Sequence, residues 1–172
     1  MKFEAPANPN YAAIVARVPV LVKLENADRL QGIPLYGLQA IVDLNTQVGD
    51  LGILFPAETQ LSHEYMFNNN LYSHASKEVG GVVQQLNADP AAKGYMGDNR
   101  RVRAIRLRGN RSDALFMPLT SLSYLGVTPA DFKEGDTFDK IGEHEICRKY
   151  VVPKRGGTSA GKQQSKKESR VD

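Results

Sequence analysis

The chain has 172 residues, of which 41% are hydrophobic and 24% are charged, and both values are typical of a folded globular protein. No apolar run is long enough to span a membrane, and the first residues, Met-Lys-Phe-Glu-Ala-Pro, lack the apolar stretch of a secretory signal. The only cysteine, Cys147, cannot form an intramolecular disulfide, which fits a reducing compartment. We therefore expect one soluble, cytoplasmic domain.

Short strands separated by turn residues dominate the pattern. Residues 12–24 are rich in β-branched side chains and are interrupted by Pro19, which predicts a bulge or an edge position. Further strands are expected at 30–35, 38–44, 51–55, 102–108, 114–119 and 137–141. Five or six short strands with few helices predict an all-β fold with minor short helices, arranged as a small closed barrel.

Two short helices and two irregular regions complete this interpretation. Ser62 is a candidate N-cap for a helix that runs to about Asn69, and Thr128-Pro129 is typical of the start of a one- or two-turn helix. Residues 74–99 are rich in glycine and polar side chains, so we expect an exposed loop there. Residues 153–172 have no apolar periodicity and predict a flexible basic linker or tail.

The positive charge of the chain is concentrated in two places. The tail holds six basic and two acidic residues, whereas residues 1–152 hold 16 basic and 17 acidic residues. Six of those 16 are arginines within twelve positions that contain no acid: Arg100, Arg101, Arg103, Arg106, Arg108 and Arg111. The planar guanidinium suits phosphate and stacks on bases, so this stretch predicts a binding site for a polyanion. The alternative is the charged, solvated face of an edge strand.

The arginines predict a particular strand geometry. Side chains alternate between the two faces of a strand, so Val102 and Ala104 would share one face and Ile105 and Leu107 the opposite one. Both apolar pairs cannot face the core in a regular strand. A β-bulge near Ala104 restores the alternation, with a turn at Gly109-Asn110 after it. This bulge predicts that Arg101, Arg103, Arg106 and Arg108 share one outward face.

No motif in the chain indicates a catalytic or metal centre. Residues 156–162 approach the phosphate-binding P-loop pattern, but Gln163 stands where a magnesium-binding hydroxyl is required. His144 and Cys147 supply two of the four ligands that a zinc site needs. We therefore predict no catalytic residue and no metal ligand in this chain.

Three segments together carry a family resemblance. They are residues 24–30 (Leu-Glu-Asn-Ala-Asp-Arg-Leu), residues 48–62 (Val-Gly-Asp-Leu-Gly-Ile-Leu-Phe-Pro-Ala-Glu-Thr-Gln-Leu-Ser) and the arginine-rich residues 101–119, which end in Met-Pro-Leu. In this order they resemble the N-terminal OB domain of the Deinococcus-type ATP-dependent RNA ligases, including their bacteriophage relatives. The resemblance covers about residues 11–152 and implies a five-stranded OB-fold barrel that binds nucleic acid over residues 1–152.

The resemblance also implies a function. In that family a following nucleotidyltransferase domain carries the lysine, in a Lys-x-x-Gly motif, that becomes linked to AMP before a 5′-phosphate is joined to a 3′-hydroxyl. Lys77 and Gly80 match that motif literally, but they lie in the expected loop, and residues 74–85 look like an insertion in the family pattern. This chain is therefore expected to be inactive alone and to need no cofactor, whereas a full-length ligase uses ATP and a divalent metal.

The expected partners are RNA or nicked duplex, with the six arginines on phosphates and exposed aromatics such as Tyr36 or Tyr95 on bases. If the chain is a fragment, a C-terminal nucleotidyltransferase domain is a further partner, and a phage-encoded protein would act in the host cytoplasm. Residues 26–30 (Asn-Ala-Asp-Arg-Leu) also resemble tRNA-binding OB modules, so a stand-alone tRNA- or RNA-binding module is an alternative. A barrel used only for protein interaction is another.

Overall fold

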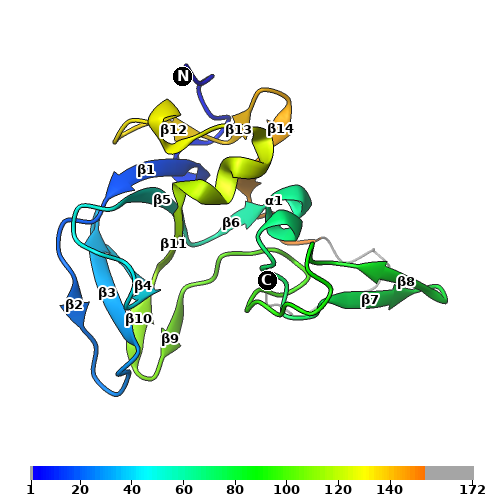
Figure 1. Cartoon of the computed structure of the whole chain (residues 1–172), viewed down its shortest axis with the longest axis horizontal. Helices are drawn as coiled ribbons and strands as arrows, with labels where there is room; N and C mark the ends of the chain where they lie inside the picture. The colour runs from blue at the N-terminus through cyan, green and yellow to red at the C-terminus, as the bar shows by residue number, and fades with distance from the viewer. Residues whose placement is uncertain (1, 154–172) are drawn as a thin grey trace, which may run out of the picture.

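The computed structural model describes residues 2–153, and most of their regular structure is β-strand (Figure 1). The strands are β1 (Ala13–Arg17), β2 (Val22–Lys23), β3 (Leu30–Leu35), β4 (Leu38–Asp43), β5 (Leu51–Pro56), β6 (Thr59–Leu61), β7 (Ser76–Val79), β8 (Val82–Gln85), β9 (Ile105–Leu107), β10 (Asn110–Ser112), β11 (Ala114–Pro118), β12 (Thr137–Phe138), β13 (Lys140–Ile141), β14 (His144–Glu145) and β15 (Cys147–Lys149). The tail predicted for residues 153–172 lies outside the described residues except for Pro153. No helix within residues 2–153 is long and apolar enough to cross a membrane.

The largest sheet contains seven strands in the order β12-β1-β5-β11-β4-β3-β2. All neighbours are antiparallel except β4 and β11, which run parallel with Ala40 opposite Ala114. Four two-stranded sheets (β9 with β10, β7 with β8, β6 with β15, and β13 with β14) surround it. The mostly β class is confirmed.

The large sheet has seven strands where the sequence predicted five or six, for two reasons. The first expected strand is divided, because Pro19 lacks an N–H and stands between β1 and β2. The short strand β12 adds an edge next to β1. The two halves of the divided strand lie near opposite ends of the sheet order, with β2 last and β1 second. A five-stranded barrel stays a prediction.

The core lies on both sides of the interior strand β5. Ile53 and Phe55 belong to one buried cluster and Leu54 to another, as expected for side chains that alternate across a strand covered on both faces. Gly52, on the same strand, touches the next one so closely that a Cβ atom there would collide with the Phe116 ring. The pairing of β5 with β11 therefore depends on a residue without a side chain.

The helices confirm two sequence predictions and add two short helices. Helix α1 (His63–Asn68) begins where expected, and the Ser62 hydroxyl accepts a hydrogen bond of 3.1 Å from the Tyr65 N–H. The 3-10 helix η3 (Pro129–Asp131) follows Thr128, whose N–H donates to the Asp131 carboxylate at 2.8 Å. The unpredicted 3-10 helices are η1 (Pro9–Tyr11) and η2 (Leu119–Leu125).

The exposed loop predicted for residues 74–99 is wrong in its interior. Residues 76–85 form the β7–β8 hairpin, with Gly80 and Gly81 at its turn in the left-handed region (φ 59° and 82°). Two glycines between β-branched residues favour this tight turn, a local signal that the composition of the segment concealed. The hairpin projects from the molecule with all eight strand residues exposed (Figure 1).

Candidate nucleic-acid interface

The β9–β10 hairpin presents two chemically different faces. Arg106 pairs directly with Arg111, and Ile105 pairs with Ser112, so each pair shares one face of the hairpin. Because side chains alternate along a strand, Ile105 and Leu107 point away from Arg106. One face therefore carries Arg106 and Arg111, and the other carries Ile105 and Leu107 together with Asn110 and Ser112.

The turn of this hairpin places a further arginine at its tip. Its two residues are Arg108 and Gly109, with φ values of 52° and 85°. Glycine, asparagine and aspartate are the residues that such turns favour, and a larger side chain at positive φ costs on the order of 1 kcal/mol. The expected turn at Gly109-Asn110 is therefore shifted by one residue, and Arg108 occupies a strained position.

Hydrogen bonds to neighbouring segments anchor the hairpin. The Asn110 amide donates to the Glu25 carbonyl at 2.8 Å, which connects the tip to the turn before β3. At the other end, the Gln39 side-chain amide donates to the Arg111 carbonyl at 2.7 Å, and the Gln39 N–H donates to the Asp113 carboxylate at 3.0 Å. The hairpin is thus fastened to the large sheet at both ends.

The single strand expected over residues 102–108 is wrong, and so is the bulge near Ala104. Buried Val102 donates its N–H to Thr59 at 2.8 Å, and its carbonyl accepts from the Glu58 N–H at 2.7 Å. Arg101 and Val102 thus pair with the segment at β6, and the next strand, β9, begins only at Ile105. The change of hydrophobic phase marks the passage from one sheet to another.

The six predicted arginines are consequently divided. Arg100 donates to the Leu61 carbonyl at 2.8 Å, and Arg101 forms a 2.7 Å ion pair with Glu58 and lies over the Tyr150 ring at 4.8 Å. Arg106, Arg108 and Arg111 lie on the β9–β10 hairpin, and exposed Arg103 stands between the two groups. The structure does not place four of these side chains on one continuous strand face.

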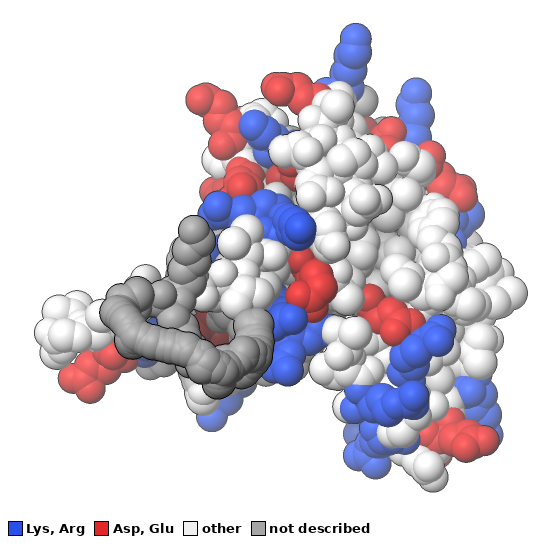
Figure 2. Space-filling view, turned by 180° about the vertical axis from the view of Figure 1, so that it is seen from behind, with Lys and Arg blue, Asp and Glu red and all other residues white. Residues whose placement is uncertain are grey.

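Four of the six arginines have no ion-pair partner within residues 2–153, and one of these, Arg100, is half-buried and donates to the Leu61 carbonyl. Besides Arg101, Arg111 is paired, at 2.7 Å from Asp113. Arg103, Arg106 and Arg108 make no ion pair among the described residues; Arg106 donates to the Gly109 carbonyl at 3.2 Å. Figure 2 shows basic side chains gathered at the end of the molecule where this hairpin lies. Whether the six arginines bind nucleic acid stays a prediction.

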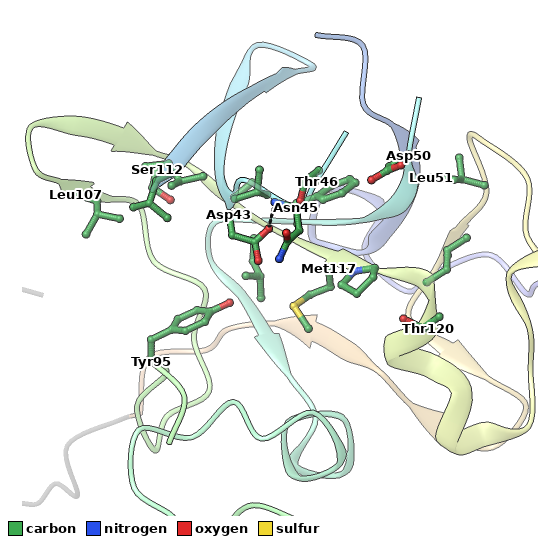
Figure 3. Close-up of a pocket in the computed structure, with 18 of the residues that line it drawn as sticks. Asp43, Asn45, Thr46, Asp50, Leu51, Tyr95, Leu107, Ser112, Met117 and Thr120 are labelled. Atoms are coloured by element: carbon green, nitrogen blue, oxygen red, sulfur yellow. Dashed lines mark hydrogen bonds between the residues drawn. The ribbon is translucent and has the colours of Figure 1, made fainter. Parts of the chain in front are cut away.

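A groove of about 1060 Å³ lies on the apolar side of the same hairpin. Its lining includes Ile105 and Leu107 of β9 and Leu115 and Met117 of β11. Figure 3 shows Leu107, Met117 and Tyr95 around this space. Asp43, Asn45, Thr46 and Asp50 contribute polar groups, as do Tyr95, Ser112 and Thr120. This groove was not predicted from the sequence, although the alternation of Ile105 and Leu107 with arginines indicated a strand with two different faces.

The two tyrosines proposed for base stacking occupy different places. Tyr36 lies in the turn between β3 and β4, is 60% exposed and is not part of the groove. Tyr95 is 67% exposed and directs its hydroxyl end into the groove, toward Asp43 and Met117 (Figure 3). Tyr95 is therefore the better placed of the two to contact a ligand.

The described residues of the rejected motifs make ordinary structural contacts, whereas residues 156–163 lie outside the described part of the chain. Lys77 lies on exposed β7 and forms a 3.0 Å ion pair with Asp98. His144 lies 3.0 Å from the Glu64 carboxylate, whereas Cys147 is buried, and burial raises the pKa of its thiol to about 12. A thiol with so high a pKa stays protonated near neutral pH and is a poor nucleophile.

No protein-family model matches the chain, and no curated protein matches it by sequence. Solved structures do match it. Two mutants of the Naegleria gruberi RNA ligase, each with ATP and Mn, align with 82% of this chain at TM-scores of 0.50 and 0.51, with 16% and 18% sequence identity. The chain spans 36% of the length of each. At these identities the likeness shows a shared fold.

Proposed function

We propose that this chain is a nucleic-acid-binding domain related to RNA ligases, which holds RNA or nicked duplex for the joining of a 5′-phosphate to a 3′-hydroxyl. The observation that carries the proposal is the cluster of Arg103, Arg106 and Arg108, whose charges have no acidic partner among residues 2–153. Unneutralised arginines on an exposed hairpin suit a phosphate backbone.

The strained turn supports the same assignment. Arg108 has a positive φ at a position where glycine or asparagine would relieve strain. Residues kept in such conformations are concentrated at functional sites. An arginine at the tip of a hairpin whose cationic face already holds Arg106 and Arg111 extends one positive surface.

The order of the strands supports an OB-type barrel as the scaffold. If residues 13–23 are taken as one strand bent at Pro19, that strand pairs with β5 through its first half and with β3 through its second. In the sheet order, β5 and β3 are the outer members of the series β5-β11-β4-β3. A single bent strand that pairs with both of them would connect the two ends of this series and give five strands in all. Five-stranded, partly open barrels of this kind bind oligonucleotides.

The joining chemistry is assigned to a nucleotidyltransferase domain outside this chain, with ATP and a divalent metal as its reagents. The shared fold with a stretch of the Naegleria gruberi RNA ligase, a protein solved with ATP and Mn, supports this relation. Arg101 and Arg111 are paired with acids and Arg100 is half-buried. The exposed and acid-free Arg103, Arg106 and Arg108 are therefore proposed as the main phosphate ligands. A cytoplasmic location belongs to the same proposal.

The test is the binding of the full chain to a nicked RNA duplex, measured by fluorescence anisotropy over a range of salt concentrations. Removing one phosphate-binding cation lowers the slope of log affinity against log salt by about 0.7–0.9, so Arg103→Gln with Arg106→Gln should flatten it by about 1.5. The control Lys133→Gln with Lys140→Gln removes the same charge from exposed residues beside β12 and β13, at the far end of the molecule (Figure 1).

The control variant should keep the wild-type slope to within about 0.4, half of the change expected for one phosphate. If both double variants reduce the slope equally, only net charge is involved and the hairpin site is wrong. If the arginine variant folds and binds like the wild type, the proposal is also overturned.

A further inference from the structure

The groove beside the arginine hairpin has no basic residue in its lining. Its polar side chains are Asp43, Asn45, Thr46, Asp50, Tyr95, Ser112 and Thr120. Two carboxylates and no cation make a poor site for a phosphate, because like charges repel in a partly desolvated cleft. The chemistry of the lining selects an uncharged, partly apolar group that offers hydrogen-bond donors.

The carboxylates in the lining keep acceptors free for such a group. One oxygen of Asp43 accepts from the Asn45 N–H at 3.0 Å, and one oxygen of Asp50 accepts from the Gln47 N–H at 2.9 Å. These bonds hold the carboxylates in place, and no described residue donates to the second oxygen of either. Each side chain is positioned and still has one acceptor atom to offer.

Flat and apolar surfaces face each other across the same space. Tyr95 presents an exposed aromatic ring on one side, with Met117 on the floor and Leu107 on the hairpin wall (Figure 3). Ile105 is 48% exposed and Leu107 is 37% exposed, so the apolar side chains on this wall are open to a ligand. Aromatic and apolar walls of this kind accept the planar face of a nucleobase.

We propose that the groove binds unstacked nucleobases that carry an exocyclic amino group, with Tyr95 as the stacking platform and Asp43 as an acceptor for that amino group. This inference rests on the proposed function and names the part of the nucleic acid that each face of the hairpin contacts. A strand crossing the hairpin edge has phosphates beside Arg106 and Arg108 and a base beside Ile105 and Leu107. Adenine, cytosine and guanine have the amino donor, whereas uracil has carbonyl acceptors in its place.

The experiment compares the binding of three single strands of about eight nucleotides each, a length within the range that such folds cover. The probes are oligoadenylate, oligouridylate and an abasic ribose-phosphate strand with the same number of phosphates. We expect the wild-type chain to bind oligoadenylate about tenfold more tightly than the abasic strand, the scale of one stacked base. Oligouridylate should fall between them.

Two variants test the assigned residues. Tyr95→Ala should bring oligoadenylate to within about twofold of the abasic strand, while the matched variant Tyr36→Ala, also at an exposed tyrosine, should leave the tenfold difference unchanged. Asp43→Asn keeps an oxygen for the Asn45 N–H and replaces the free acceptor by an amide donor. It should shift the preference from adenine toward uracil.

The outcomes separate this inference from the function on which it rests. If none of the three strands binds, the nucleic-acid function fails and the groove assignment fails with it. If the abasic strand binds as tightly as oligoadenylate, the phosphate function stands and the groove assignment is wrong. If Tyr95→Ala does not fold, an unchanged base preference in Asp43→Asn still overturns the proposal.

Discussion

The β7–β8 and β9–β10 hairpins are built alike but are supported differently. Both are antiparallel pairs joined by a two-residue turn with positive φ, at Gly80-Gly81 and at Arg108-Gly109. A two-stranded hairpin alone is at best marginally stable in water. Each therefore needs support from outside its own strands.

The support lies at the base of β7–β8 and along the length of β9–β10. Every strand residue of β7–β8 is exposed, and the first buried side chains are Leu86 and Asn87, just after it. The β9–β10 hairpin is fastened at its tip through Asn110 and at its other end through Gln39, and its apolar face lines a groove. Anchored at both ends, β9–β10 can hold charges and a groove wall in fixed positions, whereas β7–β8 projects into solvent.

The largest expected loss of stability comes from a substitution at the base of the β7–β8 hairpin. Asn87 is fully buried and accepts from the Tyr72 N–H at 3.1 Å while donating to the Tyr72 and Ala92 carbonyls at 3.0 and 2.9 Å. Asn87→Ala should lower the free energy of unfolding by about 3 kcal/mol, because it leaves buried backbone groups without partners. Thermal melting should show a drop of about 10 °C.

The matched control is exposed Asn68→Ala, which removes one side-chain bond to the Glu64 carbonyl. Hydrogen exchange should locate the added opening of the Asn87 variant in residues 71–96 rather than in β9–β10. Equal melting temperatures for the two variants would show that the base of the hairpin is not what orders it.

A smaller effect is expected at the tip of β9–β10. Asn110→Ala removes the 2.8 Å bond to the Glu25 carbonyl and should make local opening easier by about 1 kcal/mol. Amide exchange in β9 and β10 should then accelerate about fivefold. Gln84→Ala, an exposed side chain on β8, is the control and should not change exchange in either hairpin. Unchanged exchange in the Asn110 variant would mean that the anchor is not needed.

The smallest change in stability is expected from substitutions at an exposed pair of valines in the β7–β8 hairpin. Val79 and Val82 face each other across the hairpin and are 55% and 68% exposed. Val79→Thr with Val82→Thr should change the free energy of unfolding by less than about 0.5 kcal/mol in a denaturant titration, since neither valine is buried. A loss above about 1 kcal/mol would indicate that this hairpin packs against a surface after all.

Local features of the sequence were sufficient for several elements. Ser62 and Thr128 predicted the starts of α1 and η3. Pro19 predicted a bulge or an edge position, and the structure divides the strand there. The strand expected at 30–35 matches β3. These predictions succeeded because caps, prolines and alternating side chains act within a few residues of one another.

The sequence by itself therefore determined the class, most strand positions and the concentration of arginines between residues 100 and 111. Only the tertiary structure decided that Arg101 is neutralised, because Glu58 is distant in sequence and reaches it through the pairing of Gln60 with Arg101. It also decided the groove, whose lining joins Asp43, Tyr95 and Leu107 from distant parts of the chain. Strand pairing between distant segments sets such neighbours, and alternation along one strand carries no information about the strand beside it.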